Sequence, residues 1–158
     1  MKSSRFLPAI VPVLVGLLVP TIAFFAAQHI NGYVPGEDGD VDDAVAQVAG
    51  GLPLVTAFTI PGFLGLALFL FFMGDRFGSR FLWAVSLVGT GILAVLVFGP
   101  HSSMYELLYS RGRMHSTTGI GIMFVSFYCV IAAAAIAFAA RLAGNRWGSA
   151  RFSRGRVP

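Results

Sequence analysis

Three histidines and two methionines supply the residue types that most often bind haem iron, copper or zinc. His29 follows the first long apolar segment, His101 follows the third, and His115 precedes the fourth. Imidazoles at one depth on neighbouring helices can ligate a metal ion, and the thioethers of Met104 and Met114 suit copper. The sequence therefore offers the three histidines as a candidate site for haem or another cofactor, with the two methionines as candidate copper ligands.

The same histidines have two other interpretations. They fit polar contacts with a quinone or a lipid headgroup, and they fit the ordinary polar boundary of a membrane helix. Haem-ligating histidines of helical bundles usually lie a turn or more inside the bilayer, whereas these lie at the ends of apolar segments. We take the interfacial role as the default interpretation and the cofactor site as the alternative to test.

A short acidic stretch between the first two apolar segments contains five carboxylates within seven positions, namely Glu37, Asp38, Asp40, Asp42 and Asp43. The alternation "DGDVD" is the spacing with which a loop can wrap a calcium ion. A full calcium loop also needs glycine at its sixth position and glutamate at its twelfth, where this chain has Asp43 and Ala49. A specific cation site is therefore disfavoured, and the stretch is predicted as a solvated loop or as a docking surface for a basic partner.

Recognisable catalytic motifs are absent from the sequence. It contains no G-x-S-x-G, no H-E-x-x-H and no glycine-rich phosphate loop. The nearest acid–base pair is Glu106 with His101 or His115, and nothing in the spacing singles it out. The single cysteine, Cys129, excludes an intrachain disulfide and is predicted to be a small packing residue. We expect the chain to have no catalytic activity of its own.

Four apolar segments must position these residues. Hydrophobic residues make up 56% of the 158 residues and charged residues 11%, against roughly 25% charged in an ordinary soluble domain. Crossing a hydrocarbon core takes about 20 helical residues. Four segments reach this length without any Asp, Glu, Lys, Arg or His, namely 6–28, 52–73, 81–99 and 119–140. The sequence predicts an all-α integral membrane protein with four transmembrane helices in a single domain, 1–158.

The basic residues predict how the helices are threaded. One side would carry nine of them, namely Lys2, Arg5, Arg76, Arg80, Arg141, Arg146, Arg151, Arg154 and Arg156, and the other only Arg111 and Arg113. The positive-inside rule then places both termini in the cytoplasm and the connections 30–51 and 100–118 outside. The first segment is too long for a signal peptide and is predicted to be a retained anchor. Arginine-rich, alanine-rich composition is typical of a GC-rich bacterium, so we expect the bacterial inner membrane.

The connections and the packing residues refine this picture. The short turn between the second and third segments favours an up-down-up-down four-helix bundle. In the segment 104–109, Met104 and two leucines at helical spacing, with Tyr105 and Tyr109 as belt residues, predict a short interfacial helix. The segment 41–51 predicts another, stopped by its two final glycines. Close helix contacts and bends are expected at small residues and prolines, namely Ser86, Gly89, Thr90, Gly91, Ala133, Ala137, Pro8, Pro12, Pro20 and Pro61.

The C-terminal tail after residue 140 combines arginines with aromatic residues. Arginines that follow a membrane helix directly are attracted to anionic lipids, and aromatic rings settle among headgroups. The predicted headgroup contacts are Arg141, Arg146, Trp147, Arg151, Arg154 and Arg156. Docking of a partner or of RNA is the alternative for this tail, but the chain as a whole is not expected to bind nucleic acid, because its arginines flank apolar segments.

Three functions remain open from the sequence. The favoured one is a non-catalytic accessory or assembly subunit of a larger membrane complex, respiratory or envelope-building, with other membrane subunits as partners. The second is a redox or cofactor-binding subunit that uses the outer histidines. The third is a small transporter or lipid-handling protein built on proline-bent helices, although a transport pathway normally contains an ionisable residue inside the membrane.

Overall fold

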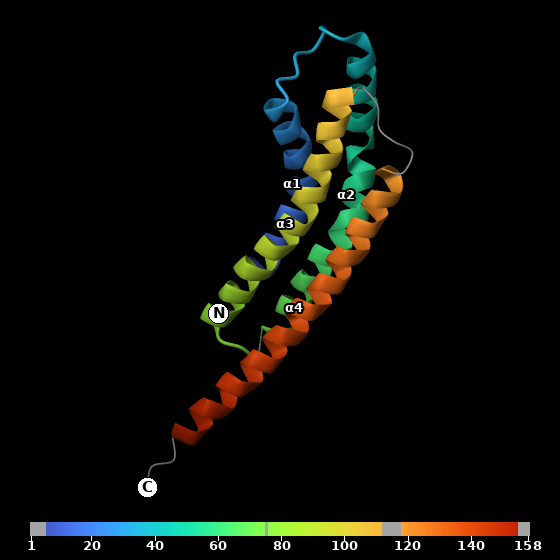
Figure 1. Ribbon diagram of the computed structural model, residues 1–158. Helices are drawn as coiled ribbons and strands as arrows, with labels where there is room; N and C mark the ends of the chain where they lie inside the picture. Colours follow the sequence, from blue (N-terminus) through green and yellow to red (C-terminus); the bar gives the residue numbers. More distant parts are fainter. Residues whose placement is uncertain (1–5, 75, 112–117, 155–158) are drawn as a thin grey trace.

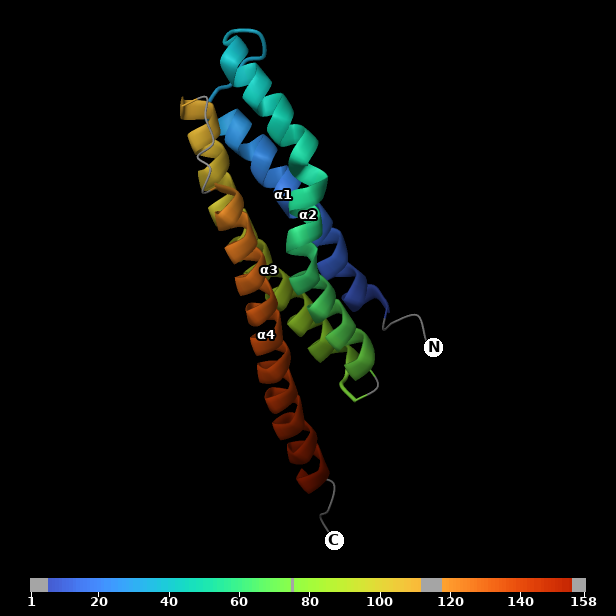
Figure 2. The same ribbon diagram turned by 90° about the vertical axis from the view of Figure 1, so that its right-hand side faces the viewer.

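The chain folds into four long α-helices. The computed structural model describes residues 6–74, 76–111 and 118–154. The helices are α1 (Phe6–Ile30), α2 (Gly39–Met73), α3 (Ser79–Arg111) and α4 (Thr118–Arg154). Successive helices run in opposite directions, and the C-terminal part of α4 extends beyond the turn that joins α2 to α3 (Figures 1 and 2). The predicted all-helical architecture is confirmed.

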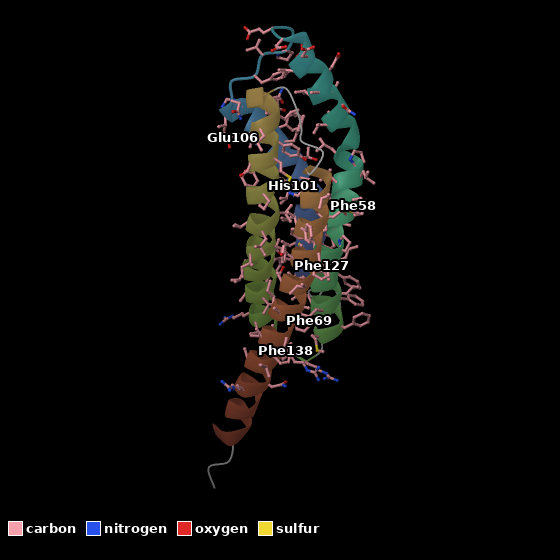
Figure 3. All side chains as sticks on the ribbon, turned by 45° about the vertical axis from the view of Figure 1, so that its right-hand side comes forward. Phe58, Phe69, His101, Glu106, Phe127 and Phe138 are labelled. Atoms are coloured by element: carbon pink, nitrogen blue, oxygen red, sulfur yellow. The ribbon has the colours of Figure 1, made fainter. Side chains whose placement is uncertain are left out.

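Each of the four helices is long and apolar enough to cross a membrane, which indicates a multi-pass membrane protein. Large apolar side chains cover the outside of the bundle, and on α3 and α4 they include Val95 and Phe127, which are 72% and 63% exposed. Figure 3 shows such side chains projecting from the helices along the length of the bundle. Surfaces of this size are stable in contact with lipid, whereas in water they would promote aggregation.

The helices form a bundle in which α2 and α3 are central. Both α1 and α4 pack against this pair, and α2 and α3 also contact each other. One buried cluster fills the middle, with Phe63, Leu66 and Leu93 fully buried. A second cluster, around Phe24 and Tyr105, fills the end of the bundle at the α1–α2 connection. We call this end the cap end.

Small residues bring the backbones together, as expected. A Cβ atom added at Gly62 would lie 2.8 Å from the carbonyl carbon of Cys129, so α2 and α4 touch at this point. Cys129 is free and fully buried there, which confirms the prediction of a packing residue. Gly89 approaches Leu66 in the same way, whereas a Cβ at Gly91 would meet nothing within 4 Å. Of the two predicted glycine contacts on α3, only the one at Gly89 forms.

Ser86 compensates for a defect that a proline creates. Pro12 lies inside α1 and has no N–H, so the carbonyl of Pro8, four residues earlier, loses its intrahelical donor. The hydroxyl of Ser86 in α3 donates to this carbonyl at 2.6 Å, and the pair is buried. Because an unpaired carbonyl in an apolar interior is costly, this bond fixes α1 against α3.

Three helices extend well beyond the predicted segments. α4 continues to Arg154, into the segment predicted as a tail, and α2 and α3 extend into the outer connections. The segments expected as separate interfacial helices are the first turns of α2 and the last turns of α3. Gly50 and Gly51 do not stop α2, although each glycine costs about 1 kcal/mol relative to alanine in a helix. The apolar face of this part, including Val45 and Val48, packs on the second buried cluster, and this packing outweighs the glycine cost.

The third helix likewise continues through Gly99 and Pro100. Pro100 removes one backbone donor, and three side chains just after it donate to carbonyls of the preceding turn. Ser102 and Ser103 bond to the oxygen of Gly99 at 3.0 and 3.1 Å, and His101 bonds to the oxygen of Val97. The predicted third segment therefore ended too early. Tyr105 and Leu108, beyond Pro100, are buried in the second cluster, and this packing outweighs the cost of the proline.

Substituting Gly62 is expected to destabilise the bundle, whereas the same change at Gly91 is not. The Cβ of Gly62→Ala would collide with the backbone of Cys129, which cannot move aside, so we expect a loss of about 1–3 kcal/mol. Gly91→Ala enters open space and is expected to be neutral or slightly stabilising. Unfolding by denaturing detergent in mixed micelles measures both. Equal stability of the two variants would contradict the close α2–α4 contact.

The Ser86–Pro8 bond can be tested with a double-mutant cycle. Ser86→Ala leaves the Pro8 carbonyl unpaired and is expected to cost about 1–3 kcal/mol. In a Pro12→Ala background the new N–H can pair with this carbonyl, so Ser86→Ala should cost much less. The same micelle unfolding assay reports the coupling. Additive effects of the two substitutions would show that the hydroxyl does not serve the carbonyl freed by Pro12.

Candidate functional site

The structure separates the predicted histidine site. His101 is fully buried in α3, whereas His29 is exposed near the end of α1. Phe24 of α1 contacts both Tyr105 and Tyr109 of α3, so His29, five residues further along, lies beyond the level of Tyr109. The rise from His101 to Tyr109 is about 12 Å at 1.5 Å per residue, so the depths of the two histidines differ by more than this. Their expected common depth is therefore wrong.

The remaining predicted ligands do not complete a metal site in the described chain. His115 and Met114 lie outside the described residues. Met104 packs its terminal methyl group against Gly121 at the start of α4, where an added Cβ would be 2.6 Å away. Within residues 6–74, 76–111 and 118–154, no three His, Cys, Asp or Glu side chains are grouped as metal ligands. Binding of haem or copper stays a prediction.

Two of the five acidic residues hold the α1–α2 connection in place. Asp38 is the N-cap of α2 and accepts hydrogen bonds from the backbone N–H groups of Asp40 at 3.1 Å and Val41 at 3.4 Å. Such a cap satisfies donors that a helix start leaves unpaired. The carboxylate of Asp42 accepts from the hydroxyl of Tyr33 and, at 2.8 Å, from the N–H of Gly36. These bonds fold the connection back onto the first turn of α2.

The other three acidic residues, Glu37, Asp40 and Asp43, are exposed on this folded connection. We call them the cap carboxylates. Acidic residues in the first turn of a helix are stabilised by its dipole, which helps to explain Asp40 and Asp42. The sequence treated all five carboxylates as one docking set. The structure distinguishes Asp38 and Asp42, whose carboxylates accept the hydrogen bonds that organise the connection, from the three cap carboxylates.

Tyr33 forms the wall of a small cavity beside the cap carboxylates. The cavity has a volume of about 150 Å³ and is lined by Tyr33, Tyr109, Asn31, Glu37 and Asp38, among others. The Tyr33 and Tyr109 rings lie 5.3 Å apart, centroid to centroid. The hydrogen bond to Asp42 raises the pKa of the Tyr33 phenol from 10.0 to about 12, with smaller contributions from desolvation and from the charge of Asp42.

A polar stripe inside the bundle was not recognised from the sequence. His101, Tyr105 and Tyr109 are spaced four residues apart, so they lie on one face of α3. We call them the α3 stripe. His101 and Tyr105 are 0% and 1% exposed, and Figure 3 places His101 within the bundle, in its cap-end half. The four-residue spacing was visible in the sequence, but the tyrosines were interpreted as interfacial because the third apolar segment was taken to end at residue 99.

The α3 stripe contains three polar atoms that lack a hydrogen-bond partner within the described chain. They are Nε2 of His101 and the hydroxyl oxygens of Tyr105 and Tyr109. Nδ1 of His101 lies 2.8 Å from the carbonyl oxygen of Val97. Because a carbonyl can only accept, Nδ1 carries the proton, and Nε2 of the neutral ring is left with a free lone pair.

The basic tail can be assessed only in part. Arg141 and Arg146 are exposed on α4, as contact with headgroups would require. The helix continues to Arg154, but the side chains of Trp147, Arg151 and Arg154 are not described, and Arg156 lies outside the described residues. Separately, an apolar groove of about 380 Å³ runs between α3 and α4 along small residues such as Ala84, Ala139 and Ala143.

The bond between Tyr33 and Asp42 predicts how the cap end responds to high pH. Since the pKa of Tyr33 is raised in the fold, its stabilising contribution should be complete below pH 10 and be lost as the pH rises to about 12. The difference in tyrosinate absorbance between the wild type and Tyr33→Phe reports the ionisation of Tyr33. In the native protein we expect this difference to appear near pH 12. With Asp42→Asn as background, it should appear closer to pH 10. Ionisation of Tyr33 near pH 10 with Asp42 intact would contradict the bond.

Comparison of the chain with protein-family models, with curated proteins and with solved structures gave no match.

Proposed function

We propose that this protein is a non-catalytic accessory or assembly subunit of a larger complex in a bacterial inner membrane. The observation that carries the proposal is the set of cap carboxylates, three exposed acidic side chains on a connection whose own hydrogen bonds hold it in one conformation. In the proposed orientation both termini are cytoplasmic, and the cap end faces the outer side of the membrane.

Preorganisation favours a docking role over a merely solvated loop. Binding through a flexible loop costs entropy, because its backbone and side chains must be ordered at the interface. Here Asp38 and Asp42 already fix the backbone on which the cap carboxylates stand. A basic patch on a partner could therefore meet three negative charges at a low ordering cost. Complementary charge of this kind speeds association and selects the partner.

The membrane-embedded part is consistent with a scaffold. Most buried side chains of the four helices are apolar, and the buried hydroxyl of Ser86 serves the backbone of α1. Exposed apolar side chains on every helix give other membrane subunits ample surface to pack on. Arg141 and Arg146, near the other end of the bundle, are positioned for anionic lipids in the proposed orientation.

Neutralising the cap carboxylates is expected to weaken partner binding. The triple variant Glu37→Gln/Asp40→Asn/Asp43→Asn should reduce recovery of co-purifying membrane proteins from mildly solubilised native membranes by roughly tenfold, because each exposed charge contributes a fraction of a kcal/mol. Recovery of the same partners by the wild-type protein should also decrease when the salt concentration is raised, because salt screens exposed charges. Quantitative mass spectrometry of crosslinked, affinity-purified material measures both effects.

Glu106→Gln is the matched control, since Glu106 is an exposed carboxylate on α3 outside the cap connection. It should leave recovery unchanged. Asp42→Asn separates the effect of charge from the effect of conformation on partner binding. It weakens the hydrogen bonds that hold the connection but keeps all three cap carboxylates. If the wild-type chain purifies alone after crosslinking, or if the triple variant retains every partner, the docking role is wrong.

A further inference from the structure

The α3 stripe requires an explanation that packing does not provide. Each buried polar atom without a partner costs about 1–3 kcal/mol, and phenylalanine at 105 or 109 would fill the same space without that cost. An ionisable side chain at membrane depth is in addition rare and usually functional. We place His101 in this class, because it is 0% exposed within the candidate membrane span Ser79–Tyr109.

The stripe is continuous with the cavity at the cap end. Its outermost member, Tyr109, lines the 150 Å³ cavity together with Tyr33. The next two members follow at intervals of four residues, about 6 Å along the helix axis. The ring centroids of His101 and Tyr105 lie 6.1 Å apart, a separation across which a water molecule can link two polar groups.

Hydrophobic side chains of α1 and α2 pack around the outer part of the stripe. The hydrophobic members that these two helices contribute to the second buried cluster are Phe24 and two alanines from α1 and alanine, valine and leucine side chains from α2. The titratable groups at the outer end are Tyr33 and its partner Asp42, with Glu37 and Asp38 on the cavity wall.

The stripe ends at His101. One and two turns further into the bundle, the same side of α3 carries Val97 and Leu93, both 0% exposed. These side chains offer no hydrogen-bonding atom to a water molecule, so a hydrated path would stop at the imidazole. Beyond them the next buried polar residue on α3 is Thr90.

We propose that ordered water molecules bridge the hydroxyls of Tyr109 and Tyr105 to Nε2 of His101, and that His101 is an intramembrane proton-binding site reached only from the cap end. A hydronium ion arriving from the cap cavity transfers its proton along this chain, the lone pair of Nε2 forms the new N–H bond, and a neutral water remains. The imidazole then carries one positive charge, while Nδ1 keeps its bond to Val97. The inference stands independently of the docking role of the cap carboxylates.

Nitrogen NMR of ¹⁵N-histidine-labelled protein in lipid nanodiscs tests the path. His101→Gln assigns the resonance. We expect Nε2 of His101 to exchange protons with water and to titrate, with Nδ1 protonated throughout. Tyr105→Phe and Tyr109→Phe each remove one hydroxyl from the chain and should slow exchange at His101 at least tenfold. The exchange of exposed His29 should not change, and Tyr128→Phe, at an exposed position of α4, should leave both rates unaltered.

Each other outcome decides against the proposal. Absence of water exchange at His101 in the wild-type protein would show that the stripe is dry, and unchanged exchange in Tyr105→Phe would show that water reaches the imidazole by another route. Haem or a metal ion bound to Nε2 in the purified protein would occupy the lone pair that the proposal assigns to a proton, and would contradict it. Proton flux across wild-type proteoliposomes that His101→Gln abolishes would mean that the path continues beyond Val97 and would overturn access from one side only.

Discussion

The architecture depends on satisfying backbone hydrogen bonds where water is absent. A membrane helix pairs its own N–H and C=O groups, and every proline inside it removes one donor. This chain places prolines inside three of its four helices. The hydroxyl of Ser86 pairs with the carbonyl that Pro12 frees in α1, and three side chains after Pro100 bond to carbonyls of α3. Ser86, which looked like one more small packing residue in the sequence, thus serves a particular carbonyl of the neighbouring helix.

The number and type of helices could be predicted from the sequence because a run of about 20 apolar residues has few other stable conformations. Their lengths could not. Two glycines in α2 and Gly99–Pro100 in α3 are local stop signals, and contacts between distant parts of the chain override them. Taking residue 99 as a helix end placed His101 at the membrane edge, whereas the continued helix buries it. The error in one boundary therefore hid the α3 stripe.

The acidic stretch shows a second limit of sequence patterns. Composition predicted five equivalent carboxylates, but hydrogen bonds give Asp38 and Asp42 conformational roles and leave the other three exposed. Which carboxylate meets a backbone N–H depends on the turn that precedes α2, where Gly36 adopts a φ of 89°. Several carboxylates lie close in sequence to the backbone N–H groups of this turn. Residue types alone therefore do not show which carboxylate accepts the hydrogen bond.

The bond between Ser86 and Pro8 also bears on the order in which the protein can be assembled. The two residues are 78 positions apart, so the carbonyl of Pro8 has no partner in α3 until the third helix has been synthesised and inserted. Pro8 lies in the first turn of α1, at the end of the helix where interfacial water can hydrate the carbonyl while it waits. The last polar group of α1 to find its protein partner is therefore one near the very start of the chain, and the third helix supplies that partner.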